Sequence, residues 1–276
     1  MLIEGSQPVS FVDRRADARK GDTAARQDAC PQLRHSQLIL PLLALGAGAA
    51  DAFAFLVLGG TFTANMTGNA VIAGLFNKPD YLSVAVGAIA ALAGFMVAIV
   101  CGLKATRGAA QAGNTARAYV IALSLAMAAQ LIVVMLWMSQ AAGDGSRLSM
   151  IFASAAGMAF QTIAAKRDHV DHGTTTTYST GTLVDLLIDV TDGRAPLRTS
   201  RWCPLIALPL GAASVATCSY VAPGLAPIIP LVTTILAMMI ILGSSDRRRW
   251  NIDPPSNPPG VVMPGQRSQT ASISGT

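Results

Sequence analysis

Six apolar stretches, each about long enough to cross a lipid bilayer as one helix, occupy most of the middle of this sequence. A spanning α-helix needs about 20 apolar residues, because it rises about 1.5 Å per residue through roughly 30 Å of hydrocarbon. Lipid gives the backbone no hydrogen-bonding partner, so such a chain folds as a helix bundle. The predicted spans are Leu38–Leu58, Tyr81–Leu103, Ala118–Ser139, Leu148–Ala165, Cys203–Ala222 and Leu225–Leu242. The sequence therefore predicts an all-α, polytopic membrane bundle whose first partner is the lipid bilayer.

The charged residues argue against several soluble classes of protein. Only 13% of the residues are charged and 52% are hydrophobic, whereas globular domains carry about a quarter charged residues. The net charge of +5 is not arranged as a basic stripe with interleaved aromatic residues, so we expect no nucleic-acid partner. The surplus of Lys and Arg lies beside the apolar stretches, where it indicates topology.

The sequence lacks the common short motifs of enzymes and of nucleotide-binding and metal-binding proteins. The four cysteines show no C-x-x-C spacing, and no G-x-S-x-G, Walker or H-E-x-x-H motif is present. The stretch 168–172 places Asp and His at ligand-like spacing, but nothing predicts the remaining ligands of a metal site. We therefore expect no enzyme activity, no cofactor and no metal.

Lys and Arg alternate between rich and poor connections along the chain, which predicts six spans with both termini in the cytoplasm. The predicted domains are a disordered cytoplasmic tail (1–37), a transmembrane domain (38–243) and a second disordered cytoplasmic tail (244–276). The stretch Tyr178–Val190 is too short and, with Asp185 and Asp189, too charged for an ordinary span. It is interpreted as an interfacial or re-entrant helix, since a seventh crossing would invert everything after it.

A short polar pattern occurs twice, once after the first span and once after the fourth. Residues 63–71 contain Asn65, Thr67, Gly68 and Asn69, and residues 176–184 contain Thr180 and Gly181. The two three-span halves would have opposite orientation, as in the inverted repeats of many secondary transporters. Each copy is either a re-entrant element with a capped half-helix, suited to an anion or polar solute, or an ordinary helix cap at a loop end.

Four further polar residues are candidates for a solute or ion pathway. Asp51 lies within the first span, where an ionisable group usually faces the bundle interior and marks a pathway or proton relay. Its alternative is a structural residue, either hydrogen-bonded to a neighbouring helix or hydrated near the membrane surface. Gln161, in the fourth span, is either the polar counterpart of Asp51 or a residue that forms a hydrogen bond between helices. Asp185 and Asp189 share a helical face, which is either solvated or able to bind an ion.

Several strings of this sequence resemble the YoaK-like family of bacterial membrane proteins. The resemblance rests on Gly48–Phe53, on Leu58–Asn69 with its Ala-Asn-Met-Thr-Gly-Asn string, on Gly157–Gln161 and on Thr180–Leu183. It implies a multi-pass protein of the bacterial inner membrane and supplies no activity to carry over. The leading hypothesis is a transporter of a small solute or ion, coupled to protons. The alternative is a membrane scaffold or sensor, and a homo-oligomer fits either.

Overall fold

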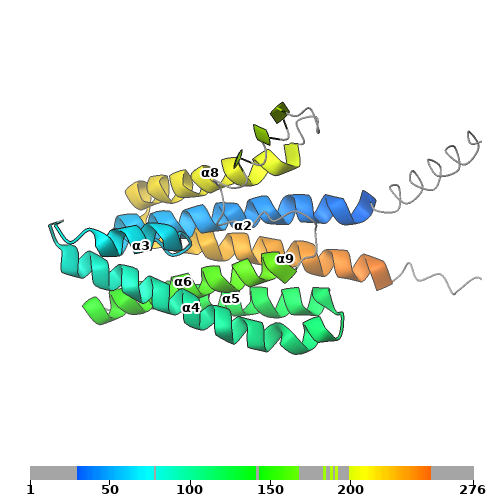
Figure 1. Ribbon diagram of the computed structural model, residues 1–276, viewed down its shortest axis with the longest axis horizontal. Coiled ribbons are helices and arrows are strands. Elements are labelled where there is room, and N and C mark those ends of the chain that lie inside the picture. The colour runs from blue at the N-terminus through cyan, green and yellow to red at the C-terminus, as the bar shows by residue number, and fades with distance from the viewer. Residues whose placement is uncertain are drawn as a thin grey trace, which may run out of the picture.

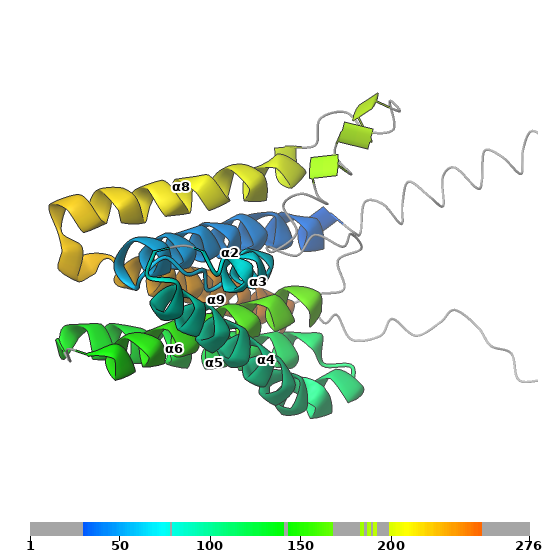
Figure 2. The ribbon, with the colours of Figure 1, turned by 60° about the vertical axis from the view of Figure 1, so that its left-hand side comes forward.

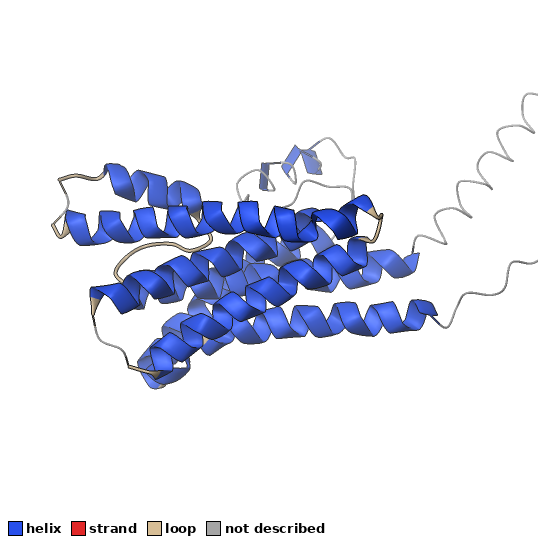
Figure 3. Ribbon diagram, turned by 90° about the horizontal axis from the view of Figure 1, so that it is seen from below, coloured by secondary structure: helices blue, strands red, loops and turns tan. Residues whose placement is uncertain are grey.

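The computed structural model describes residues 30–77, 79–140, 143–167, 183–184, 187–188, 190–191 and 199–249. In these residues all regular structure is helical (Figure 3), and six helices are long and apolar enough to cross a membrane. They are α2 Cys30–Val57, α4 Tyr81–Gln111, α5 Thr115–Met138, α6 Asp144–Arg167, α8 Thr199–Val221 and α9 Ile228–Arg249. Short helices α3 (Met66–Gly74) and η1 (Pro223–Leu225) complete the described elements. The predicted polytopic bundle is confirmed.

Three helices continue seven or eight residues beyond the ends predicted from the apolar runs. Helix α2 begins at Cys30 and α9 ends at Arg249, so both enter what the sequence predicted as disordered tails. Helix α4 continues to Gln111 and carries Lys104 and Arg107, which the sequence had placed in a loop. A helix satisfies its own backbone hydrogen bonds in water as well as in lipid, so the membrane edge does not end it. Gly113, with φ of +69°, ends α4.

Successive spanning helices run in opposite directions along the bundle, and the first residue of α2 lies at the same end as the last residue of α9 (Figure 1). Four of them, α2, α9, α5 and α6, form a ring in which each packs on the next, with a small contact that closes the ring between α6 and α2. The other two lie outside this ring. Helix α8 packs almost only on α2, and α4 packs mainly on α6, as Figure 2 shows from a second side.

The neighbour pattern has an internal symmetry. Each helix of the first half has a counterpart in the second: α6 for α2, α8 for α4 and α9 for α5. When the counterparts are exchanged, the α2–α8 contact becomes the α6–α4 contact, and the α2–α9 contact becomes the α6–α5 contact. The contacts α5–α9 and α2–α6 map onto themselves. The one clear departure is the contact of α4 with α5, because no α8–α9 contact of similar extent exists in the described residues. The packing thus agrees with the arrangement of two inverted three-helix halves.

Glycines attach both outer helices to the ring. A Cβ on Gly48 of α2 would overlap the carbonyl oxygen of Leu208 in α8, and one on Gly211 of α8 would overlap that of Leu45. On the other side, a Cβ on Gly94 of α4 would lie 2.6 Å from the backbone oxygen of Phe152 in α6. Glycine lets helix backbones approach this closely in a membrane, where van der Waals packing drives association.

Candidate functional site

The chain re-enters the bundle directly after its first span. Gly59 and Gly60, with φ of +100° and +80°, reverse its direction, and positive φ is accessible to glycine at little cost. The backbone N–H groups of Thr63 and Ala64 then donate to Oδ1 of Asp51 at 2.7 and 2.6 Å. Asp51 lies seven residues before Leu58, so the segment returns about 10 Å along α2.

Asp51 receives its hydrogen bonds from the turn that immediately precedes the short helix α3. The Thr63 hydroxyl lies 3.4 Å from the same oxygen, and the Asn65 N–H also interacts with the carboxylate. A helix N-terminus carries a partial positive charge and unpaired N–H groups, which together favour an anion. The protein's own carboxylate lies just before this helix, bonded to the two residues that precede its N-cap.

Two asparagines close the re-entrant segment, which comprises residues 59–74. The Asn65 side chain caps α3 by accepting from the N–H of Gly68 at 3.0 Å. Asn69, which is fully buried, accepts from the Phe62 N–H at 2.9 Å and donates to the Phe62 oxygen at 2.6 Å. Gly68 leaves room for the Phe62 ring, because a Cβ there would lie 2.9 Å from it. Thr67 is exposed.

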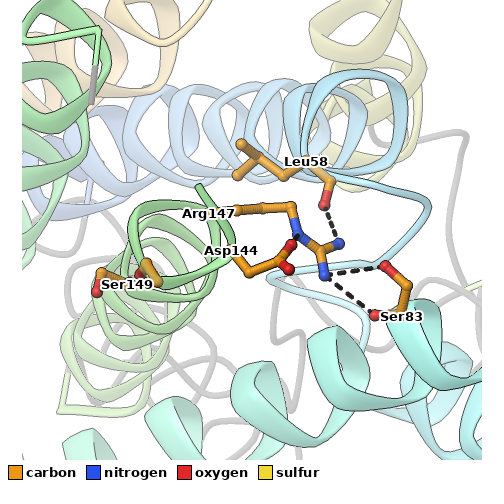
Figure 4. Close-up of polar contacts among 6 residues, drawn as sticks. Leu58, Ser83, Asp144, Arg147 and Ser149 are labelled. Carbon is orange, nitrogen blue, oxygen red and sulfur yellow. Dashed lines mark hydrogen bonds and ion pairs between the residues drawn. The ribbon is translucent and has the colours of Figure 1, made fainter. Parts of the chain in front are cut away.

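Arg147, at the start of α6, holds the base of this segment (Figure 4). Its guanidinium donates to the backbone oxygen of Leu58 at 3.1 Å, and to the backbone oxygen and hydroxyl of Ser83 at 3.2 and 3.1 Å. A positive charge at the C-terminal end of α2 is also favoured by the helix dipole. Its contact with Asp144, at 3.7 Å, involves an exposed carboxylate and contributes little. One side chain thus joins α2, α4 and α6.

Replacing Arg147 with lysine should lower the free energy of unfolding by about 1.5–3 kcal/mol, the range for hydrogen bonds to charged groups. An ammonium is a point charge and cannot reproduce the planar fork that reaches both Leu58 and Ser83. Thermal unfolding in detergent measures the effect. Arg117→Lys is the matched control, because that side chain is exposed and the bond described at this residue uses its backbone N–H. Equal melting temperatures for the two variants would contradict the role of Arg147.

Gln161 belongs to a different interface from Asp51. Its Nε2 donates to the hydroxyl of Thr234 in α9 at 2.7 Å, and both residues are buried. The structure therefore brings Asp51, Asn65, Gly68 and Asn69 together in and beside the re-entrant segment, whereas the hydrogen bond described for Gln161 goes to α9. Of the remaining candidates, Thr180, Gly181 and Asp185 lie outside the described residues, as do Asp189 and the stretch 168–172.

Sequence reasoning missed three residues that the structure places inside the bundle. Arg147 was interpreted only as a loop charge, although a single arginine beside a span can also satisfy helix ends. Gln130, buried in the middle of α5, and Thr234 in α9 were available as polar residues within otherwise apolar runs. The signal was present in both, but Gln130 lies against Gly157 and Thr234 bonds Gln161, and both neighbours are distant in the sequence.

Comparison with known proteins agrees with these features. The chain is 34% identical over 152 residues to the UPF0700 transmembrane protein YoaK of Bacillus subtilis (strain 168), an alignment that covers 55% of this chain and 66% of that protein. No solved structure matches. The model of the family described as "Protein of unknown function (DUF1275)" matches residues 39–242. That range holds all six candidate spans almost completely, together with the re-entrant segment. The chain is therefore a multi-pass membrane protein that belongs to the DUF1275 family.

Proposed function

We propose that this protein is a secondary transporter of a small solute or ion, coupled to protons through Asp51. The observation that carries the proposal is the bonding of an intramembrane carboxylate to the backbone of a re-entrant segment. Irregular backbone at membrane depth is typical of places where a membrane protein binds or conducts a solute. The symmetric packing of the two halves supports the same class of protein.

The charge of Asp51 favours a proton or another cation over an anion as the coupling species. Asp51 is the single Asp, Glu, Lys or Arg residue within the six predicted spans, and N–H dipoles rather than a cation compensate it. A carboxylate that takes up a proton becomes neutral and accepts these hydrogen bonds less strongly. Protonation would thus weaken the link between α2 and the re-entrant segment, which couples a proton to a movement of the backbone.

We also propose that the bilayer is the bacterial cytoplasmic membrane, and that the end of the bundle at which α2 begins and α9 ends faces the cytoplasm. The loop charges support this orientation, because Lys and Arg beside the spans are retained on that side. Asp51 then lies in the outer half of the membrane, and the re-entrant segment opens toward the outer face. A proton that enters from outside would meet Asp51 first.

Asp51→Asn is expected to abolish stimulation of uptake by a pH gradient, since an amide keeps the shape of the side chain but does not exchange a proton near neutral pH. The measurement is uptake by purified protein in proteoliposomes across a panel of small solutes, with and without an imposed gradient. Asp80→Asn is the matched control, because Asp80 is exposed, has φ of 61° and makes no side-chain cap bond. Asparagine tolerates that conformation well.

Two outcomes would contradict the proposal. Full gradient dependence in Asp51→Asn would remove Asp51 from the coupling mechanism. Absence of uptake by the wild-type protein for every solute of a broad panel would favour the alternative class, a membrane scaffold or sensor.

A further inference from the structure

The buried apolar residues of the bundle form two main clusters, one toward each end. The outer cluster contains Phe53, Leu58, Val133 and Ile151 among its members, and the inner cluster contains Leu43, Leu123, Ile163 and Ile241. Along each of α2, α5, α6 and α9, the residues of one cluster are separated in sequence from those of the other. The middle of the four-helix ring belongs to neither of them, and a smaller apolar cluster of Ala47, Ala50, Ala64 and Met158 occupies part of it between α2 and α6.

Polar side chains lie in this middle layer. Gln130 of α5 and Thr233 and Thr234 of α9 are buried between the two clusters, and Gln161 of α6 lies at its inner side and bonds Thr234. Two glycines make room for them. A Cβ on Gly157 would lie 2.9 Å from Nε2 of Gln130, and one on Gly46 would overlap the hydroxyl of Thr233. All four helices of the ring thus contribute to one polar layer, defined here as Gly46, Gln130, Gly157, Gln161, Thr233 and Thr234.

Gln130 is the member of the layer whose hydrogen bonding is incomplete. The residue is 1% exposed, and its Nε2 has no partner among the described residues. Gln161 and the two threonines do have partners, because both threonine hydroxyls donate to the Pro230 oxygen. An unpaired amide buried in an apolar bundle is costly, and such groups in native proteins call for a specific explanation. A leucine at this position would avoid that cost.

We propose that the polar layer is the solute site of this protein, and that it takes a small neutral solute whose oxygen accepts from the Gln130 amide. The proposal rests on the transport function proposed above. The layer contains no formal charge, so an ion would be poorly solvated there, whereas a hydroxyl or carbonyl oxygen matches an amide donor. Binding near the midplane, at the interface between two repeats, is the arrangement of many secondary transporters. The outer and inner apolar clusters then separate the site from water on the two sides.

Cysteine labelling in membrane vesicles tests this site without knowledge of the natural solute. The four native cysteines (Cys30, Cys101, Cys203 and Cys218) are replaced by serine in the full chain, and Gln130→Cys is added. Leu123→Cys and Val133→Cys are the matched controls, since both lie on α5 and are at most 1% exposed, one in each apolar cluster. The probe is a small, hydrophilic, membrane-impermeant methanethiosulfonate, applied from either side.

The Gln130→Cys protein is expected to react at least about tenfold faster than both controls from at least one side, because a site that opens even in a minor conformation is reached by water. Glycerol or urea should slow this reaction, whereas acetate and tetramethylammonium should not. Equal rates at all three positions would identify a sealed core and overturn the proposal. If acetate or tetramethylammonium slowed the reaction and glycerol and urea did not, the neutral class of solute would be overturned. Fast labelling that none of these solutes slows would identify a hydrated space and would overturn the proposed solute site.

This test separates the site from the transport function. Labelling with protection in a protein that shows no uptake would reject the transporter while keeping the binding site. Gradient-driven uptake that requires Asp51, combined with an unreactive Gln130→Cys, would keep the transporter and place its pathway elsewhere.

Discussion

Gly211→Ala is expected to lower the free energy of unfolding by about 1–3 kcal/mol or more, the usual range for overpacking a tightly packed site. The added Cβ would overlap the carbonyl oxygen of Leu45 and lie 3.0 Å from the backbone nitrogen of Ala49. Both atoms belong to the backbone of α2, so no side-chain rotation relieves the overlap. Because α8 packs almost only on α2, displacing it there weakens its whole attachment to the bundle.

Gly108→Ala is the matched control for this prediction. Gly108 also lies within a spanning helix, α4, but a Cβ there would meet nothing within 4 Å. Alanine in a helix is favoured over glycine by up to about 1 kcal/mol, so this variant should be as stable as the wild type or slightly more stable. Thermal unfolding in detergent compares the two variants. A Gly211→Ala protein as stable as Gly108→Ala would show that α8 does not depend on this close contact.

Asp51→Ala is expected to release the re-entrant segment. The substitution removes the acceptor for the N–H groups of Thr63 and Ala64, both of them buried. Leaving a buried donor without a partner costs about 1–3 kcal/mol per group. Hydrogen exchange of residues 61–74 should become much faster, while exchange in α5 should change little, because the hydrogen bonds described for Asp51 come from Thr63 and Ala64.

Asp51→Asn should fall between the wild type and Asp51→Ala in this experiment, because its amide oxygen still accepts hydrogen bonds. The order of exchange rates is therefore the readout, with Asp80→Asn again as the control for an exposed acid. Equal exchange in the wild type and Asp51→Ala would show that the carboxylate does not hold the segment. Comparison with the uptake experiment then separates the two roles of Asp51, since Asp51→Asn keeps much of the structure while losing the exchangeable proton.

The positions of the six spans could be predicted from the sequence, because hydrocarbon imposes one requirement on every residue of a crossing helix. The predicted ends of the first and fifth spans, Leu58 and Ala222, agree within one residue with the observed helix ends at Val57 and Val221. Helix ends outside the hydrocarbon, such as that of α4 at Gln111, were predicted poorly. In water the end depends on local stop signals such as Gly113, which hydropathy does not register.

The candidate site was predictable only in part. Asp51 stood out because an acid within a span is costly, and the polar pattern after that span pointed to a capped short helix, which Asn65 now supplies. That these two features bond to each other was not predictable, since 12 residues and a change of direction separate Asp51 from Thr63. Arg147 bonds Leu58, which lies 89 positions away in the sequence. Over such a separation, one sequence alone does not indicate which residues come into contact.

By itself, the sequence determined that the chain crosses the membrane as six helices. The length of an apolar stretch is a local property of the sequence, and this length must match the thickness of the hydrocarbon. The sequence also determined that one acid must be accommodated within the first span. Only the tertiary structure decided which partner that acid has, and that partner is the protein's own backbone just before α3. The physical reason is that the N–H groups of Thr63 and Ala64 lie in the irregular turn before α3 and have no partner within a helix, and packing decides where that turn lies in the bundle.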